Sequence, residues 1–336
     1  MKKRILAILI TAALAISVTG CAGNATGSSD STSASSVVES SDTSTQTSAD
    51  ASSTEESSDN GAEESKDNNS QEESKDLEAN YTKYTLDGDL TQHMIDMSRL
   101  NEGNKVRLAN VIKKLKNGEE VTVGFIGGSI TQGTSAGNEL CYAKLTADWL
   151  QQTYSSAKVN YVNAGIGATG SYIGVHRVTT DLLSKNPDLV FVEFSVNDTT
   201  EFTERNKDSY DSLLRTIWKS STNPAIITVA TTQEDGTSFQ EQHAEIVKHY
   251  DLPMISYRNT ILDTIGHGDI VWKDISDDNI HPNVPGHKIV SQLLQAYISD
   301  VDKDIDNISG NESDFSTPAT NASFENGSLL TLAQAG

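Results

Sequence analysis

Three short segments of the chain carry side chains that together could hydrolyse an ester. Ser129 follows two glycines and comes directly after an apolar stretch. Two glycines allow a sharp turn that exposes the serine hydroxyl, as a nucleophile requires. Asp278 precedes His281 by three residues, a spacing that lets the carboxylate orient the imidazole as a general base. Asn197, after another apolar stretch, could donate its amide N–H to a developing oxyanion.

Each of these segments alone is typical of an ordinary turn, because Gly-Gly and Asn-Asp sequences are common in loops. Their order along the chain, serine then aspartate then histidine, favours chemistry, since each segment lies in a loop between predicted elements. We therefore predict that Ser129 is the nucleophile, that His281 takes its proton and that Asp278 orients His281.

Apolar stretches and helical patterns alternate from residue 104 onward and predict the elements that position these residues. The predicted strands cover 121–126, 158–162, 188–194, 225–230 and 254–257, and the predicted helices cover 104–116, 138–154, 174–185, 207–220, 238–250 and 286–301. Near-continuous apolar strands between amphipathic helices indicate a parallel sheet covered on both faces. Ligands bind such sheets at the carboxyl ends of the strands, where all three segments fall.

These segments resemble the SGNH/GDSL hydrolase family, whose four blocks contribute a serine, a glycine, an asparagine and a histidine. Gly127-Gly128-Ser129-Ile130-Thr131 is similar to a variant of the first block, Asn197 to the third, and Asp278 with His281 to the last. The chain departs from the third block at Ser195, where the family commonly has glycine.

The second block of the family should lie in residues 163–171. Ala168 stands there after Gly167, at a place where the family often has a glycine, so either residue is a candidate for the backbone N–H donor. The resemblance covers about residues 100–300. It implies a flavodoxin-like three-layer α/β sandwich with a central, mostly parallel five-stranded sheet, a mechanism without metal or other cofactor, and an oxyanion hole from Ser129, Gly167 or Ala168, and Asn197.

The first 21 residues have the layout of an export signal. Lys2, Lys3 and Arg4 precede a short apolar stretch, and the run Val18-Thr19-Gly20-Cys21 resembles the lipobox of bacterial lipoproteins. We expect a lipid on Cys21 that anchors the protein at the extracellular face of the bacterial cell membrane. An ordinary signal peptide with an incidental cysteine and an uncleaved anchor are the alternatives.

Composition divides the rest of the chain into three parts. Residues 22–80 contain 17 serines, 14 acidic residues and no aromatic residue, which predicts a disordered linker, either a spacer or a solubilising tail. Residues 81–303 hold the predicted hydrolase domain. Residues 304–336 turn polar again, and we expect a linker into an absent C-terminal domain, with a frayed terminus as the alternative.

Charge and cysteine content limit the partners. Acidic residues outnumber basic ones by 47 to 25, a formal charge of −22, which argues against nucleic acid and against anionic phospholipid as partners. Two cysteines exclude a disulfide-dense scaffold. The seven histidines show no convincing metal-ligand spacing, which argues against a zinc hydrolase. Cys141 is interpreted as a core thiol.

The residues around the Gly-Gly-Ser-Ile-Thr segment are similar to carbohydrate acetylesterases, which are often joined to a carbohydrate-binding module. The resemblance implies an extracytoplasmic serine esterase that removes O-acyl groups, specifically O-acetyl, from an acylated polysaccharide. Two alternatives remain open: a lipase or lysophospholipase that uses the same triad, and a non-catalytic surface protein that binds carbohydrate. A separate motif, Gly165-Ile-Gly167-Ala-Thr-Gly170, formally fits the fingerprint of dinucleotide-binding folds, but it is weak evidence for such binding by itself.

Overall fold

A computed structural model describes residues 81–325 and 327–329. The predicted signal segment 1–21, with Cys21, and the predicted linker 22–80 lie outside the described residues. Within the described part of the chain, no helix is both long enough and apolar enough to cross a membrane.

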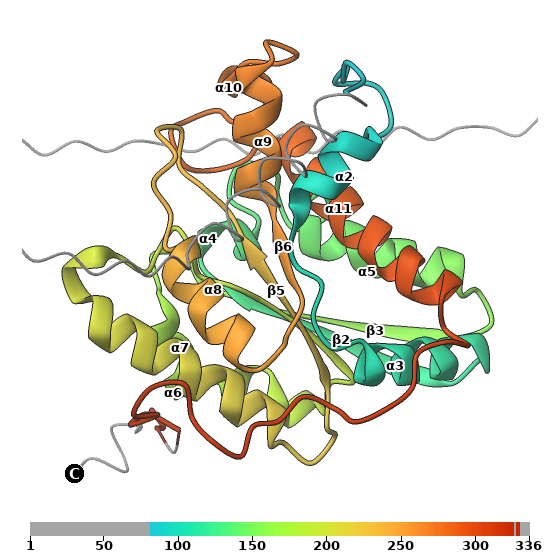
Figure 1. Cartoon of the computed structure of the whole chain (residues 1–336), viewed down its shortest axis with the longest axis vertical. Helices are drawn as coiled ribbons and strands as arrows, with labels where there is room; N and C mark the ends of the chain where they lie inside the picture. The colour runs from blue at the N-terminus through green and yellow to red at the C-terminus, as the bar shows by residue number, and fades with distance from the viewer. Residues whose placement is uncertain (1–80, 326, 330–336) are drawn as a thin grey trace, which may run out of the picture. The chain divides into compact units, whose positions relative to one another are not determined.

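Six strands form one sheet in the order β1-β6-β5-β4-β2-β3 (Figure 1). Their bounds are β1 (Arg99–Asn101), β2 (Glu120–Gly127), β3 (Lys158–Gly165), β4 (Leu189–Glu193), β5 (Ala225–Ala230) and β6 (Met254–Ser256). Strands β2 to β6 pair in parallel, and β1 pairs antiparallel with β6. The order of the parallel strands is that of flavodoxin-like folds. The predicted α/β sandwich with a mostly parallel sheet is therefore confirmed.

The predicted number of five strands is wrong because β1 was missed. This strand has three residues, all half-buried, and its register on β6 is irregular between Arg99 and Asn101. A three-residue edge strand contains no apolar run and no alternation long enough to reveal it in the sequence. Its antiparallel pairing covers the edge of β6 that a purely parallel sheet would leave open.

Helices cover both faces of the sheet (Figure 1). The described helices are α2 (Gln92–Ser98), α3 (Val106–Lys116), α4 (Ser129–Gln132), α5 (Tyr142–Thr153), α6 (Ser171–Asp181), α7 (Thr203–Trp218), α8 (Gln240–His249), α9 (Tyr257–Gly266), α10 (Trp272–Ile275) and α11 (Val284–Lys303), with short 3₁₀ turns at Leu183–Lys185 and Thr200–Phe202. Helices α3, α5 and α11 pack on one face, and α6, α7 and α8 on the other. The sequence prediction missed α2, α4, α9 and α10.

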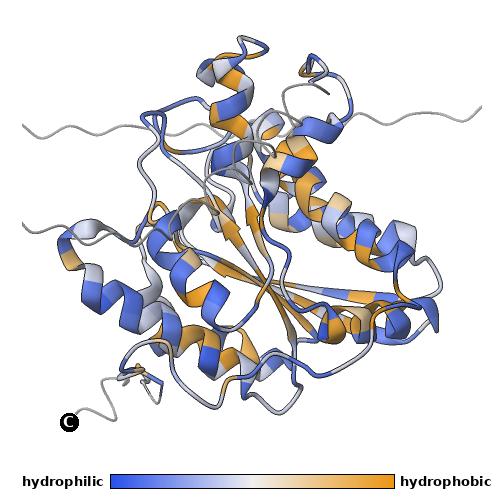
Figure 2. Ribbon diagram, viewed as in Figure 1, coloured by the Kyte–Doolittle hydropathy of each residue, from blue (hydrophilic) through white to orange (hydrophobic). Residues whose placement is uncertain are grey.

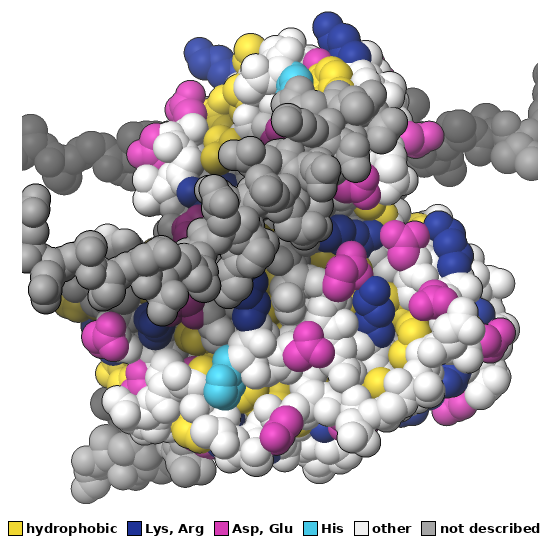
Figure 3. Space-filling model, viewed as in Figure 1, with side chains coloured by type: hydrophobic (Ala, Val, Ile, Leu, Met, Phe, Trp, Pro, Cys, Tyr) yellow, Lys and Arg dark blue, Asp and Glu magenta, His cyan; other side chains and the backbone are white. Residues whose placement is uncertain are grey.

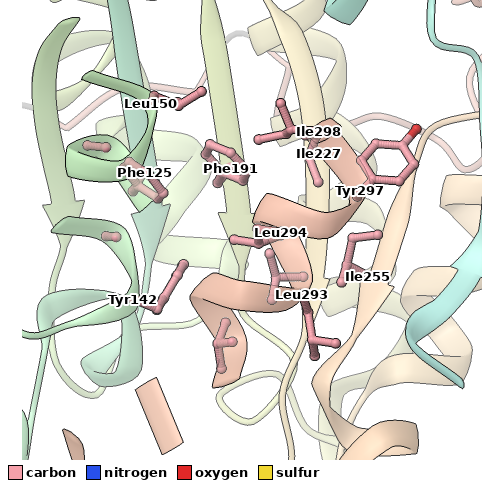
Figure 4. Close-up of a cluster of buried hydrophobic side chains, with 14 of the residues drawn as sticks. Phe125, Tyr142, Leu150, Phe191, Ile227, Ile255, Leu293, Leu294, Tyr297 and Ile298 are labelled. Atoms are coloured by element: carbon pink, nitrogen blue, oxygen red, sulfur yellow. The ribbon is translucent and has the colours of Figure 1, made fainter. Parts of the chain in front are cut away.

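The core follows from the alternation of side chains along the strands. Phe125, Phe191 and Ile227 point toward α5 and α11, where they meet Leu293 and Leu294 (Figure 4). The intervening residues of the same strands pack against α6, α7 and α8. Apolar residues accordingly dominate the strands, while the helices are apolar on one side only (Figure 2). The fully buried strands explain why the sequence showed near-continuous apolar runs.

Residues 304–325, which we call the C-terminal strap, run along the domain without regular secondary structure (Figure 1). Phe315 is 6% exposed, and its ring stacks on Tyr250 and Trp218 with centroid distances of 3.9 and 4.5 Å. The Thr320 N–H donates to Asp211 Oδ2 over 2.7 Å, and Glu325 pairs with Arg215. The folded domain therefore continues beyond the predicted boundary at residue 303. Its polar composition concealed the strap, because single side chains anchor it.

The face shown in Figure 3 carries basic side chains interspersed among acidic ones. Among the described residues, charged side chains form pairs between neighbouring elements, such as Lys207 with Glu245 and Lys114 with Asp188. Each pair joins one acid to one base, so the net negative charge is unchanged.

Candidate active site

The nucleophile candidate lies at the carboxyl end of the central strands. Chain connections leave β2 toward β3 on one side and reach β4 on the other, so a crevice is expected at the ends of β2 and β4. Ser129 follows β2 and begins α4, with its N–H at the open first turn of that helix. The residue is 8% exposed. This position leaves both its hydroxyl and its amide near the crevice.

Gly128 is required by a close approach of two loops. A Cβ atom at this position would lie 1.9 Å from Asn197 Oδ1, closer than any contact allows. Asn197 follows β4 in a turn where its N–H and that of Asp198 both donate to the Phe194 carbonyl. The structure thus brings Asn197 beside the nucleophile turn, where the sequence predicted it would act. Its Oδ1 atom is buried without a hydrogen-bond partner among the described residues.

His281 and Asp278 complete a chain of hydrogen bonds to the serine. His281 Nε2 lies 2.9 Å from Ser129 Oγ, and His281 Nδ1 lies 2.7 Å from Asp278 Oδ2. The other oxygen, Asp278 Oδ1, accepts the N–H groups of Ile280 and His281 over 2.7 and 2.6 Å. The three predicted residues, although 152 positions apart at the extremes, therefore form the geometry of a serine hydrolase triad.

Hydrogen bonds hold the loop that carries Asp278 and His281. Trp272 Nε1 donates to the Asp278 carbonyl over 2.7 Å, and Ser276 Oγ donates to the His281 carbonyl over 2.6 Å. Asn283 then caps α11 by accepting the Gly286 N–H. These bonds hold the carboxylate and the imidazole in one orientation relative to each other.

Local hydrogen bonding keeps Asp278 ionised. Burial alone would raise the pKa of its carboxyl group, but hydrogen bonds from His281 and from the Ile280 N–H, together with the charge of His281, bring this pKa below its usual value. Half of the side chain is exposed, so water screens part of this effect. An ionised carboxylate at this place can hold the imidazole and stabilise its protonated form.

The second predicted oxyanion segment also lies beside the serine. A Cβ atom at Gly167 would be 3.8 Å from Ser129 Cβ, and the Gly167 N–H donates to Gln132 Oε1 over 3.0 Å. Ala168 adopts φ = 58°, in the left-handed region that disfavours residues with a Cβ. The glycine of the family pattern is explained by this conformation, and Ala168 occupies it at a cost in backbone energy.

A buried hydrogen bond between a histidine and an aspartate, which the sequence analysis missed, joins the two oxyanion segments. His243 Nε2 donates to Asp198 Oδ2 over 2.9 Å, and both side chains are 1% exposed. Asp198 Oδ1 accepts the Ser171 N–H over 2.9 Å, directly after the segment that contains Ala168. One carboxylate therefore positions the turn of Asn197 and the loop before α6. The partner of Asp198, His243, lies 45 residues away in the sequence. In the sequence, only its place on the buried side of a helix distinguishes it.

Another buried carboxyl group, that of Glu193, lies close to α4, the helix that begins at Ser129. Glu193 is fully buried at the end of β4, where Oε1 accepts from Thr231 Oγ1 over 2.7 Å and Oε2 lies 3.4 Å from Thr131 Oγ1 in α4. Burial raises its pKa to about 7, although hydrogen bonds from both threonines oppose this change. A charged residue inside an apolar strand was the feature of the sequence that could have revealed it.

Two hollows are lined by residues close in the chain to Ser129 and to Asp278. One, of about 310 Å³, begins one turn along α4 from Ser129 and is lined by Gln132, Asn138, Tyr161, Asn163 and Gly165. The other, of about 260 Å³, is next to Asp278 and is lined by Gln233, Glu234, Asp235 and Asn279. Polar groups make up more than half of the exposed lining of the first hollow, which suits ligands with hydroxyl groups, whereas that of the second is mostly apolar.

Two further sequence interpretations are resolved by the fold. Cys141 is buried before α5, with its Sγ near the Asn138 carbonyl, and is a core thiol as predicted. The next residue, Tyr142, is fully buried in the core. The glycine of the dinucleotide-like motif at Gly165 packs on the backbone of α4, since a Cβ there would lie 2.3 Å from the Gln132 nitrogen. This contact accounts for that glycine without a dinucleotide.

Hydrolases of one large class share this architecture. They have a flavodoxin-like sheet with hydrogen-bonded Ser, His and Asp residues at the carboxyl ends of its strands. Residues 125–289 match the model of the GDSL-like lipase/acylhydrolase family and therefore form a domain of that family. The family that the sequence motifs resemble is thereby confirmed.

Two solved structures similar to this chain are of a two-domain esterase described as active on acetylated mannans. One, co-crystallised with mannopentaose, is 36% identical with a TM-score of 0.63, and the other is 37% identical with a TM-score of 0.66. Each match covers 69% of this chain, and the chain spans 61% and 62% of the respective esterase chains. No curated protein matches the chain.

Proposed function

We propose that this protein is a serine esterase that removes O-acetyl groups from a polysaccharide outside the bacterial cell. The observation that carries the proposal is the hydrogen-bonded chain from Ser129 Oγ through His281 to Asp278, with distances of 2.9 and 2.7 Å, inside a domain of an acylhydrolase family. Nucleophile, base and orienting carboxylate are all present in the arrangement that acyl transfer requires.

The reaction proceeds in two acyl-transfer steps. Ser129 Oγ attacks the ester carbonyl carbon while His281 Nε2 takes its proton, and collapse of the tetrahedral intermediate expels the sugar oxygen, which receives that proton from His281. Water then attacks the acetyl-serine carbonyl and gives a proton to His281. Breakdown releases acetate and returns the proton to Ser129 Oγ. Asp278 stabilises the imidazolium in both steps.

The intermediate oxyanion is stabilised by three donors in this proposal. The Ser129 N–H lies at the open start of α4, and the Asn197 amide lies against Gly128. Between the two backbone candidates, we assign the third donor to Ala168, because the Gly167 N–H is already engaged by Gln132. A preorganised donor of this kind contributes about 100-fold or more to the rate.

The substrate class is supported by the comparisons and by the hollow beside Gln132. The similar solved structures are of an esterase described as active on acetylated mannans. The hollow beside Gln132 has a mostly polar exposed lining, which suits sugar hydroxyl groups better than a long acyl chain. The net charge of −22 also repels anionic phospholipid.

The proposal is tested by initial rates on para-nitrophenyl acetate, butyrate and octanoate and by acetate release from acetylated mannan. The expected result is activity on acetate and on acetylated mannan that is lost in Ser129→Ala and retained in Ser135→Ala, a control in the exposed loop after α4. Preference for octanoate would indicate a lipase or lysophospholipase. Carbohydrate binding without hydrolysis would indicate a non-catalytic binding protein.

The location of the enzyme is a separate part of the proposal. It is supported by the basic start, the apolar stretch and the lipobox-like run that ends at Cys21. Membrane fractionation of cells that express the full chain tests it. The wild type is expected in the membrane fraction with its domain accessible to external protease, and Cys21→Ser is expected to leave that fraction. Equal membrane retention of both forms would contradict lipid anchoring.

A further inference from the structure

Two histidines and an aspartate meet between α2 and α9, two helices that carry none of the triad residues. His93 comes from α2, while Asp263 and His267 come from α9 and its C-cap, four residues apart on one side of the helix. Their ligand atoms all lie within 4.8 Å of one another. The sequence spacing gave no indication of this cluster, because His93 is 170 residues from Asp263.

The cluster has the donor types and the spacing of a metal site. Asp263 Oδ2 lies 2.7 Å from His93 Nε2 and 3.4 Å from His267 Nδ1. Two ligands of one tetrahedral zinc ion, each about 2.0–2.1 Å from the metal, are about 3.3 Å apart. The longer distance already fits, and the shorter one must open by about half an ångström. Imidazole nitrogen and carboxylate oxygen are ligands that Zn²⁺ prefers.

The surroundings hold the three side chains together. Thr260 Oγ1 in α9 donates to the Met94 carbonyl in α2 over 3.1 Å, which fixes the two helices next to the cluster. The Tyr81 ring stacks on His267 at a centroid distance of 4.1 Å and meets His93 edge-on at 5.3 Å. The His93 side chain is 3% exposed and that of Asp263 19%, so a bound ion would be partly shielded from water.

We propose that His93, Asp263 and His267 bind a divalent cation of the zinc class, which fastens α2 to α9. His93 Nε2, Asp263 Oδ2 and His267 Nδ1 supply three ligands, and water completes the coordination. The hydrogen bond from His93 Nε2 to Asp263 Oδ2 is replaced by bonds to the metal, and the proton of His93 Nε2 moves to Nδ1. Likewise, His267 Nδ1 gives up its hydrogen bond to the Asp263 carbonyl, and its proton moves to Nε2.

The place of this site in the chain defines what the metal would do. α2 is the first helix of the described residues, and α9 leads through α10 to the loop of Asp278 and His281. The ion would therefore clamp the start of the domain onto the segment that carries the triad loop. Its role is structural, and it takes no part in the proposed ester hydrolysis.

The test is a titration of the full-length protein, first freed of metal by a chelator. We expect one equivalent of Zn²⁺ to bind by calorimetry, a rise in the unfolding temperature, and a tetrahedral visible absorption spectrum with Co²⁺ as the probe. His93→Ala and Asp263→Asn should each weaken Zn²⁺ binding at least tenfold. Asp263→Asn is the milder change, because asparagine can still accept a hydrogen bond from His93, and it keeps the test valid if His93→Ala fails to fold.

Two control variants separate this site from other zinc-binding groups. His281→Ala removes the triad imidazole, and His249→Ala removes an exposed imidazole on α8; both should keep full affinity. Absence of stoichiometric binding in the wild type overturns the proposal. So does affinity that is unchanged in Asp263→Asn or lost only in His281→Ala.

Discussion

The free-energy cost of burying a titratable group beside α4, the helix that begins at Ser129, can be measured directly at Glu193. The change is Glu193→Gln, which keeps the shape of the side chain and its ability to accept from Thr231 but removes the titration. The wild-type carboxyl is fully buried, and its pKa is raised from 4.5 to about 7. In the unfolded chain the same group titrates near 4.3.

The sign of the effect follows from proton binding in the two states. Below about pH 4 both states hold the proton, and above about pH 7 both have lost it. Between these values the folded state keeps a proton that the unfolded state releases, so the stability of the wild type falls as pH rises. A pKa difference of about 2.5 corresponds to about 3 kcal/mol, the cost of keeping the carboxylate of Glu193 in a buried place.

Urea unfolding of both proteins at pH 5 and pH 8 measures this difference. At pH 5 the wild-type carboxyl is mostly neutral in the folded state but already mostly ionised in the unfolded state, so about 1 kcal/mol of the change has already occurred. Between pH 5 and pH 8 we expect the free energy of unfolding of Glu193→Gln to rise by about 2.5 kcal/mol relative to that of the wild type. Glu119→Gln, at an exposed position, controls for the loss of one surface charge. A difference between wild type and variant that is the same at both pH values would refute the reasoning.

Three other predictions concern the strap and the oxyanion loops. Phe315→Ala should lower the free energy of unfolding, measured by urea titration, by about 3 kcal/mol. The control Phe202→Ala, at a side chain that is 45% exposed, should lower it by less than about 1 kcal/mol. Equal losses in the two variants would contradict the packing of the C-terminal strap. Asp198→Asn should lower kcat by up to about 100-fold with a smaller change in KM, and an unchanged kcat would show that the buried pair does not position the loops. Gly128→Ala should lower kcat about 100-fold because its Cβ displaces Asn197, and a fully active, stable variant would exclude that close approach.

The sequence was informative wherever consecutive residues share one environment. Strand β5 was predicted with its observed bounds, 225–230, because all six of its residues are buried. β1 was missed because its three residues are only half-buried, and α9 because Tyr257, its first residue, was included in the preceding strand. Local patterns report local burial, and a short element at a sheet edge hardly differs from a loop.

The residues of the candidate site likewise divide into those that the sequence revealed and those that it did not. Turn chemistry and chain order singled out Ser129, Asn197, Asp278 and His281 as one set, and the fold places all four at the ends of β2 and β4 and in the loop before α11. The supporting carboxyl groups escaped notice because each depends on partners elsewhere in the chain. His243 gains meaning only from its contact with Asp198, 45 residues earlier.

The sequence by itself determined the order of the main strands and helices, the family and the set of residues proposed as the triad, because periodicity, turns and motifs are properties of neighbouring residues. Only the tertiary structure decided the strand order, the engagement of the Gly167 N–H by Gln132, the docking of the strap through Phe315 and the meeting of His93 with Asp263 and His267. Each of these depends on side chains distant in the chain, and spacing along a sequence carries no record of which distant surfaces pack together.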